Sequence, residues 1–213
     1  MTDEEKIEYY RRESYSYAKE MDRYVDCVKD IKSRILTIQK SIANPGYYNN
    51  CLEVEFVCLQ FRSILELIIL SSLVNHAKEY NKTYEQMKTL WRIKPIMKRL
   101  EEINQEYFPI PVSIGASEPF ALTTLANTGN ILTKDEILDF YGVLSDYTHP
   151  KNPFADAKDA VAMWNSFHVF WRKITNLLNV HLLQPLNLKV KFLVISNFEN
   201  DKDPDVIYLR VDE

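Results

Sequence analysis

The sequence contains only four glycines among its 213 residues, and none of them stands in a phosphate-binding pattern. Loops of the GxGxxG and GxxxxGK[ST] kinds need glycines so that the backbone can approach a phosphate closely. The sequence therefore excludes a nucleotide-binding loop of either kind. Repeats with a period of about 20–50 residues are also lacking, which excludes repeat architectures.

Cysteines and long apolar runs are scarce as well. Cys27, Cys51 and Cys58 are odd in number and widely spaced, which is not the pattern of a disulfide framework. The longest apolar run, residues 67–74, is far shorter than the ~18 residues that a membrane span needs. The first residues are charged where a signal peptide has an apolar segment. We therefore expect a cytoplasmic protein without membrane contact.

Positive charge is not in excess, since 26 Lys and Arg residues stand against 30 Asp and Glu residues. Residues 199–213 hold six acidic and two basic residues, so this tail carries the whole net charge of −4. Strong non-specific attraction to nucleic acid is therefore not predicted, whereas a local basic patch is compatible with this charge. The content of 46% hydrophobic and 26% charged residues is typical of a soluble folded domain.

Hydrophobic periodicity predicts an all-α fold, a helical bundle with a long N-terminal helix and a small C-terminal β-hairpin. We divide the chain into a heptad-patterned helix (residues 1–45), a helical bundle (46–185) and a hairpin with an acidic tail (186–213). Between Ile7 and Ile42 the apolar residues recur at alternating spacings of three and four, with Ser14 as the one polar member of the pattern. Such a helix packs along its own bundle or pairs with a second subunit, and we expect a homodimer.

The remaining elements follow from shorter patterns. A second helix over residues 50–80 is apolar on nearly every face and should form the centre of the bundle. Residues 108–132 predict a long loop with a short strand at 120–125, and the last long helix extends to about Leu183. Two strands at residues 189–195 and 207–211 predict the hairpin.

One of the four histidines stands in a setting that suits chemistry. Thr133 and Glu136 form a capping-box pattern, which predicts a helix that ends at about Ser145 or Tyr147. His149 follows this helix end, precedes Pro150 and has Asp146 three residues before it. An imidazole on such a turn can face solvent and accept a proton near neutral pH. The alternative is that His149 only caps the helix C-terminus. His76, His168 and His181 are interpreted as structural histidines.

Arg62 and Glu66 lie four residues apart on the second helix, so they share one face of it. Buried charges are costly unless paired. Two interpretations stay open: an internal ion pair that orients its neighbours, or an Arg62 that meets an anion in a cleft.

A run of basic residues follows around Trp91, and it contains Lys88, Arg92, Lys94, Lys98 and Arg99. Such a run either follows a phosphate backbone or forms a solvated helical face. No HExxH motif or Cys–His cluster occurs, so neither a metal site nor another cofactor is predicted.

Two of these segments resemble the HEPN superfamily, over about residues 50–180. They are Phe61-Arg62-Ser63-Ile64-Leu65-Glu66 on the second helix and Leu144-Ser145-Asp146-Tyr147-Thr148-His149-Pro150 at the end of a later one. The resemblance implies a compact helical domain, often dimeric, of prokaryotic toxin–antitoxin and phage-defence systems. Active members of the superfamily are metal-independent ribonucleases that use an Arg and a His on an R-x(4–6)-H motif. His149 matches this His, but residues 141–144, where the Arg belongs, include no basic residue.

The sequence therefore favours a HEPN-like protein with a vestigial nuclease site that binds RNA or a partner protein such as an antitoxin. In this hypothesis the catalytic-site residues are His149, Asp146, Arg62 and Glu66, and the RNA contacts are Lys151, Asn152, Lys88, Arg92 and Lys98. The first alternative is an active ribonuclease with His149 as general base and a cation from Lys151, Arg62 or a partner subunit. The second is a helical scaffold or dimerisation protein without nucleotide function. The hypothesis requires Arg62 and His149 to share one solvent-accessible hollow.

Overall fold

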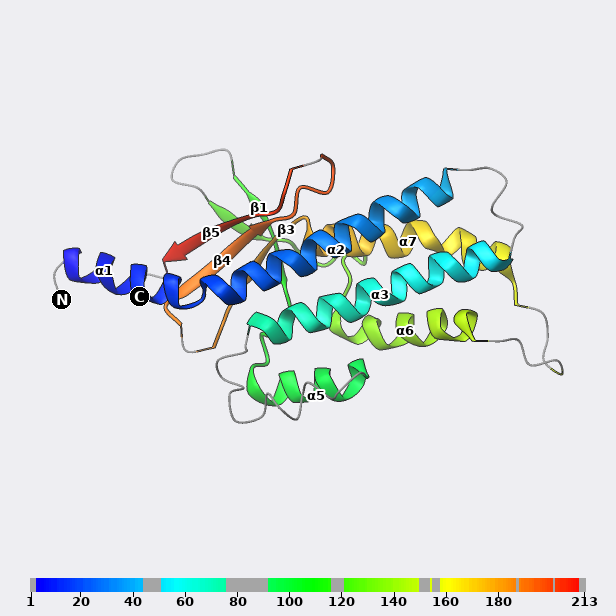
Figure 1. Ribbon diagram of the computed structural model, residues 1–213, viewed down its shortest axis with the longest axis horizontal. Helices are drawn as coiled ribbons and strands as arrows, with labels where there is room; N and C mark the ends of the chain where they lie inside the picture. Colours follow the sequence, from blue (N-terminus) through cyan, green and yellow to red (C-terminus); the bar gives the residue numbers. More distant parts are fainter. Residues whose placement is uncertain are drawn as a thin grey trace.

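Helices and an antiparallel sheet together build the protein in the computed structural model (Figure 1). The structure describes residues 3–43, 51–75, 92–115, 121–149, 154, 158–186, 188–200 and 202–210. The helices are α1 (Asp3–Ser16), α2 (Ala18–Ile42), α3 (Cys51–Asn75), α5 (Ile93–Ile103), α6 (Lys134–Thr148) and α7 (Ala160–Leu178). The strands are β1 (Ile110–Ile114), β2 (Leu122–Thr124), β3 (Val180–Leu183), β4 (Val190–Ile195) and β5 (Asp205–Arg210).

The described strands form one antiparallel sheet in the order β2-β1-β3-β4-β5. The expectation of an all-α bundle with only a small hairpin is therefore wrong, because the fold combines helices with a five-stranded sheet. The β4–β5 hairpin and the short strand β2 agree with the sequence pattern. The strands β1 and β3 do not, and they connect the hairpin to β2 in a single sheet.

Both unexpected strands have weak signals in the sequence. The sequence pattern assigns β3 to the end of the last helix, since a short apolar run does not distinguish a strand from a buried helix. The helix α7 instead ends at Leu178, and Leu182 of β3 lies opposite Leu193 of β4. In β1, Pro111 has no backbone N–H, which argues against a strand. Its carbonyl nevertheless accepts a hydrogen bond from the Leu125 N–H (3.0 Å).

The expected single helix over residues 3–43 divides at Tyr17 into α1 and α2. The apolar seam of α2 is buried within its own chain from Met21 to Ile38, and Ile42 at its end is partly buried. Val28 belongs to a cluster with Phe192 of the sheet, whereas Ile31 and Ile35 belong to the core of the helical bundle. The α2 part of the heptad pattern is therefore intramolecular.

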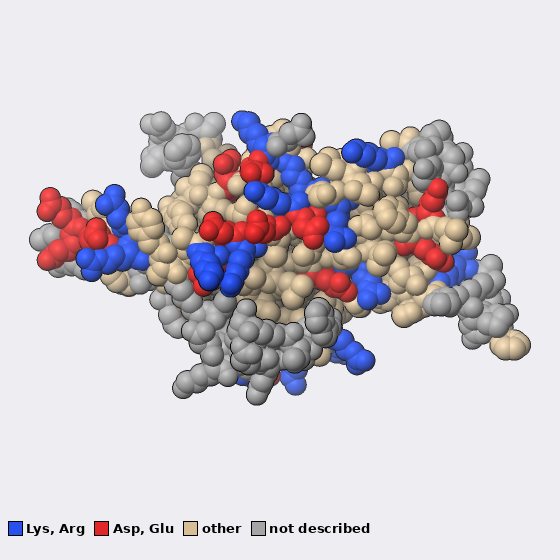
Figure 2. Space-filling view, in the orientation of Figure 1, with Lys and Arg blue, Asp and Glu red and all other residues tan. Residues whose placement is uncertain are grey.

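The helix α1 projects beyond the rest of the molecule (Figures 1 and 2). Its apolar side chains Ile7 and Tyr15 are 59% and 74% exposed. Its second half touches the sheet, where the Arg210 guanidinium lies 4.8 Å from the centre of the Tyr10 ring. The α1 part of the heptad pattern thus leaves apolar residues in solvent.

The helix α3 is the centre of the bundle, as its composition predicts, and it packs against α2, α5, α6 and α7. Among the described helices, α3 is the one long and apolar enough to cross a membrane, over Cys51–Val74. Half of this segment is buried inside the protein. Contact with four other helices makes α3 the core helix of the bundle.

A network of buried hydrogen bonds connects α2 to the sheet. The Tyr24 hydroxyl donates a hydrogen bond to Nε2 of His181 (2.7 Å), and Nδ1 of His181 donates to the Leu178 carbonyl (2.9 Å). Tyr24 and His181 are both fully buried. Burial lowers the pKa of His181 to about 4, so its imidazole is neutral at physiological pH. His181 is therefore a structural histidine, in agreement with the sequence-based interpretation.

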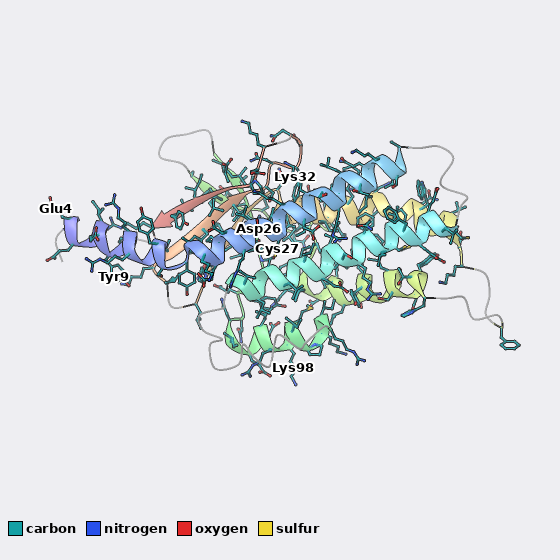
Figure 3. All side chains as sticks on the ribbon, viewed as in Figure 1. Glu4, Tyr9, Asp26, Cys27, Lys32 and Lys98 are labelled. Atoms are coloured by element: carbon teal, nitrogen blue, oxygen red, sulfur yellow. The ribbon has the colours of Figure 1, made fainter. Side chains whose placement is uncertain are left out.

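A second contact fastens α2 to the loop between β4 and β5. Lys32 is only 8% exposed, and its ammonium group donates to the carbonyls of Asn197 (2.7 Å) and Lys202 (2.6 Å). Figure 3 shows Lys32 on α2 beside this loop. On the surface next to it, Lys29 pairs with Asp203 at 2.9 Å. The acidic C-terminal hairpin is therefore held against α2 by lysines.

Candidate functional site

Arg62 and Glu66 of α3 form a polar cluster with Tyr141 of α6. Nε of Arg62 donates hydrogen bonds to Oε1 of Glu66 (3.3 Å) and to the Tyr141 hydroxyl (3.1 Å). That hydroxyl donates to the same Glu66 oxygen (2.8 Å), and the guanidinium lies 5.1 Å from the centre of the Tyr141 ring. The helix spacing predicts the ion pair, whereas the contact with Tyr141 arises only when α6 packs on α3.

The cluster keeps Arg62 charged and in place. Burial and the hydrogen bond to Glu66 raise the pKa of Tyr141, so its hydroxyl stays protonated. Burial acts to lower the pKa of Arg62, but the contacts with Tyr141 and Glu66 outweigh it and raise that pKa. Nη1 of Arg62 reaches the Thr148 hydroxyl at 3.5 Å. No described residue is hydrogen-bonded to Nη2, which leaves this group for a ligand.

A hollow of about 420 Å³ lies where the first half of α3 meets the end of α6, and we call it the α3–α6 hollow. In Figure 1 this is the end of the bundle at which α3 begins and α6 ends. Its lining residues are Leu52, Glu55, Phe56, Leu59, Arg62, Thr148 and His149. The expectation that Arg62 and His149 share one hollow is therefore confirmed. Apolar side chains line the same hollow, and they include Phe56, which is 42% exposed.

His149 is the C-terminal cap residue of α6, and its backbone N–H donates to the Ser145 carbonyl (3.1 Å). Lys158, just before α7, donates from Nζ to the carbonyls of His149 (2.6 Å) and Tyr147 (3.0 Å). A cation at the last carbonyls is favourable because the C-terminus of a helix carries partial negative charge. Lys158 therefore positions the backbone of His149, while the imidazole has no hydrogen-bond partner among the described residues.

The other predicted site residues fall into three groups. Glu66 holds Arg62 but does not line the α3–α6 hollow. Asp146 is exposed on α6 and does not line it either, so the structure does not bring Asp146 to His149 and Arg62. Lys88, Lys151 and Asn152 lie outside the described residues.

The predicted RNA contacts Arg92, the N-cap residue of α5, and Lys98, on α5, are exposed. The other face of α5 buries Ile93, Ile96, Met97 and Leu100. Arg99, next to them, donates to Glu102 at 2.7 Å. Figures 1 and 3 place α5, with Lys98 labelled, away from the end of the bundle that holds the hollow. These residues form a solvated helical face, apart from the α3–α6 hollow.

Two kinds of chemistry find no support among the residues that the structure describes. No group of three or more His, Cys, Asp and Glu side chains there can hold a metal ion. Burial raises the pKa of the Cys27 thiol to about 11 and that of the Cys58 thiol to about 12, so neither is a thiolate near neutral pH. Cys51 is exposed, and all three cysteines are free.

The interpretation of His168 as a structural histidine does not fit its position, because His168 is exposed on α7. It lines a separate hollow of about 420 Å³ between α2 and α7, together with Trp171 and Arg172. The sequence pattern places it on the buried side of an apolar helix. His76, the remaining histidine, lies outside the described residues.

The sequence pattern does not predict the apolar wall of the α3–α6 hollow. Leu52, Phe56 and Leu59 are 73%, 42% and 46% exposed, although they lie on the most apolar of the described helices. Their spacing of four and three residues is a helical stripe. Since α3 is apolar on nearly every face, this stripe does not stand out from the core positions in the sequence.

No protein-family model, curated protein or solved structure matches the chain. The likeness to the HEPN superfamily therefore rests on the motif residues themselves, chiefly Arg62, Glu66 and His149. The five-stranded sheet is not part of the all-helical domain that this likeness implies.

Proposed function

We propose that this protein binds RNA at the α3–α6 hollow, as a HEPN-like protein of a prokaryotic toxin–antitoxin or phage-defence system in the cytoplasm. The observation that carries the proposal is the position of Arg62, a fixed guanidinium on the same hollow as His149. Residues 141–144 lack the Arg of the family motif, but Tyr141 binds the guanidinium that α3 supplies.

The first support is electrostatic. A phosphate accepts two parallel hydrogen bonds from a guanidinium, and an arginine already held in one position loses less entropy when it binds. Nε of Arg62 is held by Glu66 and Tyr141, while Nη2 has no partner among the described residues. The backbone phosphate of a nucleic acid is the anion that matches this arrangement.

The second support is the apolar wall. Proteins that bind single-stranded RNA stack its bases on aromatic side chains next to cationic groups that hold the phosphates. The exposed ring of Phe56 and the side chain of Leu59 lie on the same hollow as Arg62. A base on this wall leaves its phosphate within the hollow that also contains His149.

Binding without cleavage fits the geometry better than catalysis. In a metal-independent cleavage a base takes the proton of the ribose 2′-hydroxyl, whose oxygen then attacks phosphorus. The 5′-oxygen leaves with a proton from an acid, and a 2′,3′-cyclic phosphate remains. Here the imidazole of His149 has no orienting partner among the described residues, and Asp146 does not line the hollow. We infer a vestigial nuclease site.

The test of RNA binding compares two arginines in similar settings. Arg62 and Arg34 are each 30% exposed in their side chains, each pairs with a carboxylate four residues away, and Arg34 does not line the hollow. Binding of a fluorescein-labelled single-stranded RNA of about ten nucleotides is followed by anisotropy at several salt concentrations. Arg62→Gln should weaken binding at least about tenfold, since it removes a charge-assisted hydrogen bond. It should also reduce the salt slope by about 0.7, whereas Arg34→Gln should not.

Three results would contradict the proposal. Equal effects of Arg62→Gln and Arg34→Gln would show that the hollow is not the RNA site. A flat salt response of the wild type would exclude phosphate contacts. Absence of RNA binding at any salt concentration would favour the scaffold function instead.

An active ribonuclease is the second candidate, favoured by the presence of a guanidinium and an imidazole on one hollow. Incubation of the same RNA with purified protein in EDTA, followed by gel analysis, decides between the two. Cleavage that disappears in His149→Ala would establish the enzyme and refute the vestigial site. Intact RNA with both proteins supports binding alone.

We also propose that the protein forms a homodimer through α1. The first half of α1 holds four acidic residues and Lys6, and its second half holds Arg11 and Arg12 with Glu13, so the two halves carry net charges of −3 and +1. Within the helix, Arg12 pairs with Glu8 at 3.1 Å. An antiparallel pair of α1 helices, related by a two-fold axis, brings opposite charges together and covers Ile7 and Tyr15. Figure 2 shows both kinds of charge on the projecting helix. A partner protein such as an antitoxin is a further candidate for this surface.

A further inference from the structure

A second hollow, of about 450 Å³, lies between α2 and α3, and we call it the α2–α3 hollow. Its lining residues are Thr37, Lys40, Ser41, Glu53 and Phe56. Phe56 also lines the α3–α6 hollow, so the two hollows meet at its ring. A ligand in the α3–α6 hollow that stacks on Phe56 therefore has the α2–α3 hollow directly beside it.

The Glu53 carboxylate is an acceptor to which no described residue donates a hydrogen bond. Its Oε2 atom is buried, and the carboxylate has no hydrogen-bond partner among the described residues. The two hydroxyl groups of the same hollow are already committed, because Thr37 donates to the Ser33 carbonyl (2.9 Å) and Ser41 to the Thr37 carbonyl (3.1 Å). A buried carboxylate oxygen that lacks a hydrogen bond is costly. Because this oxygen is closed to solvent, a ligand in the hollow recovers the cost only when the Glu53 side chain turns toward the hollow.

The spacing of the residues along α3 places the Glu53 carboxylate beside the Phe56 ring. Glu53 and Phe56 are three residues apart on α3, so their side chains are neighbours on one helical face. Lys40 is exposed on the opposite wall and has no ion-pair or hydrogen-bond partner among the described residues. The hollow therefore combines a stacking ring, a carboxylate acceptor and a cation.

We propose that the α2–α3 hollow selects guanine in the RNA that the protein binds. The guanine stacks on Phe56, and the Glu53 side chain turns toward the hollow so that its two oxygens accept from the N1–H and N2–H groups. Lys40 contacts an adjacent phosphate. This inference rests on the proposed RNA binding and adds base specificity to it.

The donor pattern of the four bases is what favours guanine. Guanine alone presents two adjacent donors on its Watson–Crick edge, which match the two oxygens of one carboxylate. Adenine and cytosine present one amino group beside an acceptor nitrogen, and uracil presents one N–H between two carbonyl oxygens. Each of these three bases places a lone pair against the carboxylate, which is unfavourable in a partly buried hollow.

The test uses a fluorescein-labelled oligouridine of about ten nucleotides with a single central guanosine. The same strand carries inosine, which lacks the N2 amino group, or adenosine, which also lacks the N1–H donor. The wild type should bind the guanosine strand at least about tenfold more tightly than the adenosine strand, with the inosine strand between them, since a hydrogen bond to a charged group corresponds to roughly a tenfold change or more.

Glu53→Gln and Glu55→Gln form a matched pair of variants. Both remove one negative charge from the first turns of α3, but Glu55 lines the other hollow. Glu53→Gln should abolish the guanosine preference while it leaves the affinity for pure oligouridine equal or higher, because a carboxylate no longer repels the phosphates. Glu55→Gln should keep the preference. Phe56→Leu should weaken the binding of every strand.

The outcomes separate this inference from the proposed function. If Arg62→Gln weakens RNA binding but the wild type shows no preference for guanosine, RNA binding stands and the guanine site is refuted. A preference that survives in Glu53→Gln also refutes the site. If the preference depends on Glu53 while Arg62→Gln has no effect, the guanine site stands and the phosphate role of Arg62 is wrong. Circular dichroism of each variant verifies that it is folded.

Discussion

Acid should destabilise this protein through a single buried imidazole. His181 accepts a hydrogen bond from Tyr24 and donates one to the Leu178 carbonyl, and no charged group contributes to the shift of its pKa. Protonation would place an unpaired positive charge in the contact between α2 and the sheet. Burial is the main cause that lowers the pKa of His181 to about 4.

The sign and the size of the effect follow from proton linkage. In the unfolded chain the histidine has its ordinary pKa of about 6.5. Between that pH and the pKa of about 4 in the folded state, only the unfolded chain binds the proton. The stabilisation is therefore complete above about pH 6.5 and is lost as the pH falls towards 4. Lowering the pH from 7 to 5 should reduce the free energy of unfolding by about 2 kcal/mol.

The measurement is urea unfolding, followed by circular dichroism, at pH 7 and pH 5. His181→Gln keeps a polar side chain that does not titrate, so it should lose about 2 kcal/mol less than the wild type between these two pH values. His168→Gln removes an exposed histidine and should behave as the wild type does. Equal pH dependence of the wild type and His181→Gln would refute the assignment of acid sensitivity to His181.

Two further predictions concern α2 and α1. Lys32→Met leaves the Lys202 carbonyl without its lysine donor, while the Asn197 carbonyl keeps only the Asn200 N–H (3.3 Å). It should reduce the free energy of unfolding by about 1–3 kcal/mol in urea unfolding, with faster hydrogen exchange in that loop. Lys29→Met, on the exposed surface, should have a smaller effect, and an equal effect would contradict the buried role of Lys32. Ile7→Asp should convert the dimer to a monomer in sedimentation velocity without a change in circular dichroism, and a dimer that persists would show that α1 is not the interface.

Much of the helical part of the fold can be predicted from the sequence. The apolar composition of α3 predicts a central helix, and the Thr133–Glu136 capping box, which forms at the start of α6, is a local signal that packing does not change. The heptad spacing predicts the buried face of α2, since a periodic pattern specifies which side of a helix avoids water. The spacing does not specify whether the residues that bury this face belong to the same chain or to a second one. Here Ile31 and Ile35 pack within the chain.

The sheet cannot be predicted to the same degree, because β1 and β3 pair with each other although they lie far apart in the chain. Ile110 lies opposite Leu182, and this pairing exists only when α6 and α7 have brought the two segments together. Each segment by itself is short, and β1 contains Pro111. A strand of this kind gains its hydrogen bonds from its neighbours, so its own residues carry little signal.

The candidate site likewise has features that the sequence predicts and features that only the structure shows. The sequence by itself determines the residue types that chemistry needs, a histidine at a helix end and an arginine paired with a glutamate one turn away, because these depend on local spacing. Only the tertiary structure decides that Arg62 binds Tyr141, that Phe56 is left in solvent, and that Arg62 and His149 share a hollow while Asp146 lies outside it. The physical reason is that a helix pattern states which residues share a face, whereas the packing of α3 on α6 and α2 determines which faces meet.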